Sequence, residues 1–228
     1  MFMPATAFSA EEALNTAVAG VLSRMTAGVG ITMIVAALVA ALGWVPLLFS
    51  GALGWVIVFS PLVISLALMV GGESLTESQI KIAYLAFAGA MGLSLSLLFA
   101  LYTNASIAQA LVGTTVSFAA LAGWGYFTKR DLSSWGAFLF AGVIGLIVAG
   151  VVNIFLASSV LQLVVNVLAL VIFLGLTAYD MQRIRDLFWH IPRDQIARQQ
   201  WFGALSLYIN FINIFVSLLQ LTGTKSND

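Results

Sequence analysis

Long apolar stretches alternate with short polar breaks along the whole chain. Each stretch is long enough to cross the hydrocarbon core of a bilayer as an α-helix, which takes about 20 residues for roughly 30 Å. The pattern predicts an all-α fold, a polytopic membrane helical bundle with seven transmembrane helices. The predicted spans are residues 25–45, 52–70, 82–102, 105–127, 135–157, 159–179 and 202–221.

The two ends of the chain are predicted to be short. Residues 1–24 form a polar N-terminal arm, residues 25–221 form the transmembrane domain, and residues 222–228 form a C-terminal tail. The arm carries Glu11 and Glu12 but no basic residue before Arg24. A secretory signal peptide begins with positive charge, so the arm is not expected to be one.

Composition supports the membrane assignment and excludes several classes of protein. The chain is 61% hydrophobic and only 8% charged, whereas soluble domains carry about 25% charged residues. Nine basic and nine acidic residues balance, so no net field attracts a nucleic acid. Cysteine is absent, which excludes thiol catalysis, thiolate metal sites and disulfides.

The distribution of Lys and Arg predicts the orientation in the membrane. With seven spans, eight of the nine basic residues fall on the side of the N-terminus, and only Lys225 falls on the other. Basic residues collect in cytoplasmic connections. The N-terminus is therefore expected in the cytoplasm and the C-terminus outside.

The last predicted span carries a polar stripe along one helical face. Steps of three and four residues align its members, which are Gly203, Ser206, Asn210, Asn213, Ser217 and Gln220. Such a face cannot be exposed to lipid, because polar groups in hydrocarbon are costly. Two interpretations stay open: the stripe lines a water-filled path, or its side chains bond neighbouring helices and serve packing alone.

The span over residues 159–179 repeats this theme with Asn166 and Thr177, and Asp180 follows it directly. Asp180 is the acid nearest to the interior of any span. It has two interpretations. One is a juxtamembrane charge paired with Arg183 three residues later, and the other is a titratable group that faces the interior.

Several enzyme chemistries are excluded by missing residues. The only histidine, His190, lies outside the predicted spans, so no span offers the Ser–His pair of an intramembrane serine protease. The zinc motif His-Glu-x-x-His and the phosphate-binding glycine motifs are also absent. We therefore expect a protein that is not an enzyme and has no cofactor.

Three stretches carry a resemblance to a known family. They are residues 125–133 (Gly-Tyr-Phe-Thr-Lys-Arg-Asp-Leu-Ser), 175–182 (Gly-Leu-Thr-Ala-Tyr-Asp-Met-Gln) and 203–213 (Gly-Ala-Leu-Ser-Leu-Tyr-Ile-Asn-Phe-Ile-Asn). With the seven spans they resemble the Bax inhibitor-1 family, the transmembrane BAX inhibitor motif proteins, in its bacterial branch. The resemblance implies six helices around a central seventh. It also implies a pH-sensitive calcium leak controlled by two aspartates, one in each of the last two spans.

One of the two family aspartates is replaced in this chain. The first matches Asp180, whereas the second matches Asn210, whose amide cannot share a titrating proton. The resemblance thus implies an ion- and pH-sensing site at Asp180 and Asn210, with calcium bound weakly at Asp180 because one carboxylate replaces two. It also implies a weaker or more acidic pH response. Residues expected to line the pore or the central helix are Asn213, Ser206, Asn166 and Thr177.

Three functions remain open from the sequence. The first is a pH-sensitive calcium leak channel, expected in a bacterial inner membrane, with calcium ions and the lipid bilayer as its partners. The second is a non-conducting membrane regulator that binds a membrane-anchored ATP-dependent protease or other membrane proteins, an alternative that the loss of the second aspartate favours. The third, a proton-coupled transporter, has only a single candidate acid in its support.

Overall fold

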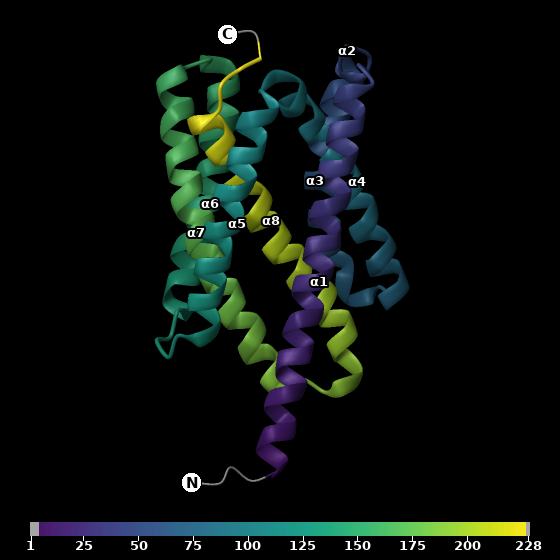
Figure 1. Ribbon diagram of the computed structural model, residues 1–228, viewed down its shortest axis with the longest axis vertical. Coiled ribbons are helices and arrows are strands. Elements are labelled where there is room, and N and C mark those ends of the chain that lie inside the picture. Colours follow the sequence, from purple (N-terminus) through teal and green to yellow (C-terminus); the bar gives the residue numbers. More distant parts are fainter. Residues whose placement is uncertain (1–4, 227–228) are drawn as a thin grey trace. The chain divides into compact units, whose positions relative to one another are not determined.

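The computed structural model describes residues 5–226, which form helices joined by short connections (Figure 1). Within these residues, seven helices are long and apolar enough to cross a membrane, and no strand forms beyond one isolated bridge between Tyr102 and Lys225. The predicted all-α membrane bundle is confirmed. In chain order the elements are α1 (Ala5–Ala41), α2 (Val45–Leu48), α3 (Ala52–Gly71), η1 (Gly72–Ser74), α4 (Glu77–Leu101), α5 (Asn104–Phe127), α6 (Ser133–Leu156), α7 (Ser159–His190), η2 (Arg193–Gln195) and α8 (Ile196–Thr222).

Helix α1 begins well before the first predicted span. It is continuous from Ala5 to Ala41, and its apolar candidate span starts at Glu11. The predicted arm, residues 1–24, is therefore helical from Ala5 onward, and its residues 1–4 lie outside the described part. Alanine and glutamate favour helix, so a helix continues there although hydropathy falls.

Residues 181–201, which follow the sixth predicted span, are largely helical. Helix α7 runs on to His190, and α8 begins at Ile196. Gln, Arg and Leu are good helix formers, so polarity alone does not end α7. The interruption comes at Pro192, which lacks a backbone N–H donor. Asp180 consequently lies inside a continuous helix.

The chain divides into two compact units. The first unit holds α1–α4, the end of α7 from Phe188 and the first part of α8 to Tyr208. The second unit holds α5, α6, the rest of α7 to Leu187 and α8 from Ile209 to Thr222. Helix α8 thus supplies one half to each core.

The core of the first unit is aromatic. Tyr208 of α8 lies between the rings of Tyr84 and Phe87, with centroids at 6.1 and 5.0 Å. The Thr32 hydroxyl donates to the Ala88 carbonyl at 2.8 Å, so Tyr208 donates its own hydroxyl to Thr32 Oγ1 at 2.6 Å. These contacts join α1, α4 and α8.

Trp201 is buried, unlike the other five tryptophans. It is buried in the first unit, where the Arg24 guanidinium lies 4.8 Å from its ring centroid and Tyr84 packs against it. The other five tryptophans are exposed, as interfacial side chains are. Trp201 differs because it belongs to α8.

Helix α8 is the most buried spanning helix. In its apolar window 67% of residues are buried, against 6–33% in the other six candidate spans. Leu207, Phe211 and Ile214, opposite the polar stripe, are buried as well. A helix with a polar face can occur here because most of its residues are covered by protein and not by lipid.

Candidate functional site

Asp180 and Asn210 meet inside the second unit. The Asn210 Nδ2 group on α8 donates a hydrogen bond to Asp180 Oδ2 on α7 at 2.8 Å. The two residues are only 2% and 3% exposed. A hydrogen bond to a charged acceptor is stronger than one between neutral groups. The carboxylate and the amide therefore connect the last two spans at a buried point.

The second oxygen of Asp180 faces a cation from its own helix. Arg183 Nη2 lies 3.3 Å from Asp180 Oδ1, and the Arg183 side chain is 51% exposed while that of Asp180 is 3% exposed. The arginine therefore spans from the buried carboxylate to the surface. Asp180 both faces a cation at i+3 and lies in the interior, so the two interpretations of this residue are compatible.

The other predicted lining residues make separate contacts. Thr177 is buried, and its hydroxyl donates to the Phe173 carbonyl at 2.8 Å, one turn back along α7. Asn213 Nδ2 likewise donates to the Ile209 carbonyl at 2.8 Å. Ser206 belongs to the first unit. Side chains bonded within their own helix fit helix packing as well as a pore lining.

Asn166 belongs to a group of amides near the ends of α6, α7 and α8 in the second unit. Gln162 is its centre: Nε2 donates to Asn166 Oδ1 at 3.0 Å and to Gln220 Oε1 at 3.2 Å, and Oε1 accepts from Asn153 at 3.1 Å. Sequence reasoning missed the role of Asn153. The sequence gives one sign of this role: Asn153 is a polar residue near the end of one predicted span, and Gln162 is near the start of the next.

The donor set at Asp180 does not fit a resident calcium ion. Calcium takes six to eight oxygen ligands, whereas Asp180 offers one carboxylate whose nearest partners are an amide N–H and a guanidinium. Among the described residues, no group of three or more His, Asp or Glu side chains could hold a metal.

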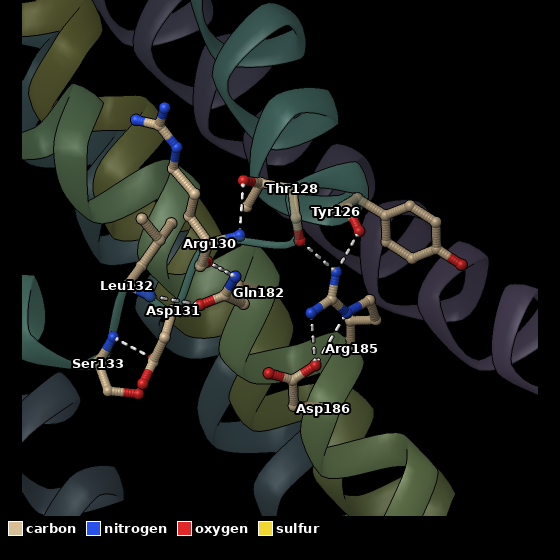
Figure 2. Close-up of polar contacts among 9 residues, drawn as sticks. All are labelled: Tyr126, Thr128, Arg130, Asp131, Leu132, Ser133, Gln182, Arg185 and Asp186. Carbon is tan, nitrogen blue, oxygen red and sulfur yellow. Dashed lines mark hydrogen bonds and ion pairs between the residues drawn. The ribbon is translucent and has the colours of Figure 1, made fainter.

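A second polar cluster, missed by sequence reasoning, ties α7 to the α5–α6 loop, residues 128–132 (Figure 2). The Gln182 side chain clamps the loop backbone at two points. Its Oε1 accepts from the Leu132 N–H at 2.9 Å, and its Nε2 donates to the Arg130 carbonyl at 2.8 Å. One side-chain amide thus provides the hydrogen-bond partner for a backbone N–H and for a backbone carbonyl of the loop.

Arg185 completes this cluster at the end of α5. Its Nη1 donates to the carbonyls of Tyr126 and Thr128 at 2.6 and 3.1 Å. The last carbonyls of a helix lack partners within the helix and carry partial negative charge. A cation bonded there stabilises the helix end. Asp186 balances the guanidinium at 2.7 Å.

Replacing Gln182 by Ala is expected to lower the free energy of unfolding by about 1–3 kcal/mol, because a buried backbone N–H and a carbonyl lose their partner. Thermal unfolding in detergent, followed by circular dichroism, measures the change. Gln195→Ala, at an exposed residue, is the control and should unfold like the parent. Equal unfolding temperatures for both variants would contradict the clamp.

Seven candidate spans and a buried carboxylate–amide contact between the last two define an integral membrane protein of the helical-bundle class. A family model described as "Inhibitor of apoptosis-promoting Bax1" matches residues 14–227. The chain therefore belongs to the Bax inhibitor-1 family, and the resemblance inferred from the three motifs is confirmed.

Bacterial relatives agree with this membership. Inner membrane protein YbhL of Escherichia coli (strain K12) is 36% identical over 93% of both chains. An uncharacterized protein of Caulobacter vibrioides is 41% identical over 74% of this chain and 68% of its own length. An "Uncharacterized membrane protein" of Streptococcus pyogenes serotype M3 is 35% identical over 61% of each chain.

Proposed function

We propose that this protein is a calcium leak channel of a bacterial inner membrane, with Asp180 at its gate and no catalytic activity. The observation that carries the proposal is the buried hydrogen bond from Asn210 to Asp180, which joins the last two spans. Polar groups buried in a membrane protein mark ion pathways. The similarity to an inner membrane protein supports the location. The excess of basic residues on one side supports a cytoplasmic N-terminus.

In this proposal, the strength of the contact between α7 and α8 at Asp180 controls whether the channel is open or closed. While Asp180 is ionised, it accepts from Asn210 and attracts Arg183, and α7 and α8 are held together. Protonation removes the charge and weakens both interactions. Separation of the two helices would then uncover the polar face of α8 that continues through Asn213.

The Asn210 amide limits the response to pH. A pair of close carboxylates shares a proton, because both cannot ionise together without repulsion. An amide stays neutral, so only one group of this contact titrates. Calcium flux through the protein should therefore depend less steeply on pH than flux gated by two carboxylates, and calcium should bind more weakly.

The variant Asn210→Asp is expected to steepen the dependence of calcium entry on pH. Entry into dye-loaded liposomes, titrated from pH 5 to pH 8, measures the effect. Asn104→Asp makes the same change at an exposed residue at the start of α5 and should leave the profile close to that of the parent. A parent profile already as steep as that of Asn210→Asp would refute the role of the amide.

The alternative is a non-conducting regulator that binds a membrane-anchored ATP-dependent protease or other membrane proteins. The observation in its favour is Arg183, which balances the charge of Asp180 and leaves the site less attractive to a cation. Calcium entry no faster than in empty liposomes, both at pH 6 and at pH 7.5, would support it. Co-purification with membrane proteases would then test the partner.

A further inference from the structure

The α5–α6 loop, residues 128–132, has a conformation set by the rest of the second unit. Gln182 bonds the loop backbone on both sides of Asp131, and Arg185 bonds the Thr128 carbonyl where α5 ends (Figure 2). Side chains carried by the loop are therefore presented from a fixed backbone. A fixed backbone lowers the entropy lost when these side chains bind a ligand.

Two cations are presented by this loop. Lys129 and Arg130 are both exposed. Arg130 is held only through its backbone, and its side chain extends away from the cluster (Figure 2). Among the side chains that the structure describes, neither pairs with an acid, and the ion pairs there join Arg183 to Asp180 and Arg185 to Asp186.

The loop also carries an acid, Asp131, whose carboxylate bonds the start of α6 and neither of the two cations. Asp131 Oδ1 accepts from the Ser133 N–H at 2.8 Å, in the first turn of α6. Hydrogen bonds from the Ser133 hydroxyl and backbone hold the pKa of Asp131 below its usual value, so the group is ionised at neutral pH. Its charge compensates the positive end of α6. Lys129 and Arg130 remain as the charges directed to solvent.

Apolar aromatic side chains flank the same loop. Phe127, directly before it, is 79% exposed, and Trp135, in the first turn of α6, is 61% exposed. Trp124, one turn back on α5, is exposed as well. Exposed aromatics at span ends lie at the boundary between acyl chains and headgroups. Cations that directly follow such aromatics are expected to lie close to the lipid phosphates.

We propose that Lys129 and Arg130, on the clamped α5–α6 loop, bind the headgroup of an anionic phospholipid. The Arg130 guanidinium can donate two parallel hydrogen bonds to phosphate oxygens, and Lys129 adds a second positive charge. The exposed rings of Phe127 and Trp135 contact the acyl chains. Free phosphate shares the headgroup chemistry but lacks these chains, so the bilayer lipid is the ligand. The site does not depend on ion conduction.

Lipid retention by the full chain tests the proposal. Native mass spectrometry in neutral detergent compares phosphatidylglycerol with phosphatidylcholine, titrated against the parent and K129Q/R130Q. The double variant is expected to bind phosphatidylglycerol about 25-fold more weakly, about fivefold for each charge, which corresponds to about 1 kcal/mol per basic residue near a membrane surface. Phosphatidylcholine binding should change less than twofold.

A charge-matched variant separates a built site from general electrostatics. K81Q/R193Q removes the same charge from two exposed residues and is expected to bind phosphatidylglycerol within about twofold of the parent. Gln182→Ala keeps both loop cations but releases the backbone, and should weaken binding several-fold. An equal loss in K81Q/R193Q, or equal retention of the two lipids by the parent, would overturn the proposal. Competition by soluble glycerol phosphate as strong as by the lipid would assign the site to free phosphate instead.

Discussion

Replacing Asp180 by Asn is expected to raise calcium entry into liposomes about tenfold and to remove its dependence on pH. The carboxylate accepts from Asn210 and faces Arg183. A hydrogen bond to a charged group contributes about 1.5–3 kcal/mol. Because about 1.4 kcal/mol corresponds to a tenfold change in an equilibrium, loss of the charge shifts the closed state toward the open state by at least that factor. Initial rates of entry at pH 6 and pH 7.5 measure both effects.

A matched control for this variant lies on the same helix. Asp186→Asn makes the same chemical change at a side chain that is 52% exposed and paired with Arg185. It should leave calcium entry within about twofold of the parent, because exposed ion pairs contribute little. If Asp180→Asn and the parent leak at the same rate, Asp180 is not a gate, and the regulator becomes the better proposal.

Replacing Gly125 by Ala is expected to lower the free energy of unfolding by about 1–3 kcal/mol, as overpacking of a close contact does. A Cβ at Gly125 would overlap the Ala178 carbonyl oxygen and lie 2.8 Å from the Ala178 Cα. These are backbone atoms of α7, so no side-chain rotation relieves the overlap. Circular dichroism during thermal unfolding in detergent measures the loss.

Gly123 provides the comparison within the same helix. A Cβ there would meet no atom within 4 Å, and Ala is the better helix former. Gly123→Ala is therefore expected to unfold at or slightly above the temperature of the parent. If Gly125→Ala unfolds at the same temperature as Gly123→Ala, α5 and α7 do not approach each other as closely at Gly125 as the structure shows. A displaced α7 would also shift Asp180, two residues beyond Ala178, so calcium entry should change only in Gly125→Ala.

The spans were predictable because each depends on a local property. A window of about 20 apolar residues has a high hydropathy wherever it packs, and the seven predicted windows all fall within helices of the structure except for a few end residues. The helix ends were less predictable. Hydropathy reports where the chain leaves the hydrocarbon, whereas a helix continues until a residue such as Pro192 interrupts its hydrogen bonds.

The candidate site was predictable in part. Asp180 and Arg183 are one helical turn apart, so their pairing follows from spacing alone. The partnership with Asn210 came from the family resemblance, because no periodicity relates residues 30 positions apart. The clamp by Gln182 escaped prediction altogether. An amide at the end of a span has no distinguishing pattern, and the bonds of Gln182 to Arg130 and Leu132 arise across about 50 residues of sequence.

The amino-acid sequence by itself determined an all-α membrane bundle and the polar stripe of the last span, and it offered the i+3 pair at Asp180 as one of two interpretations. These features follow from composition and from spacings within one helix. Only the tertiary structure decided that α8 is buried on both faces, that Asn210 donates to Asp180, and that Gly125 sits against the backbone of α7. The physical reason is that contacts between helices depend on how each helix is rotated and how closely it packs, which side-chain shapes on several distant segments set together.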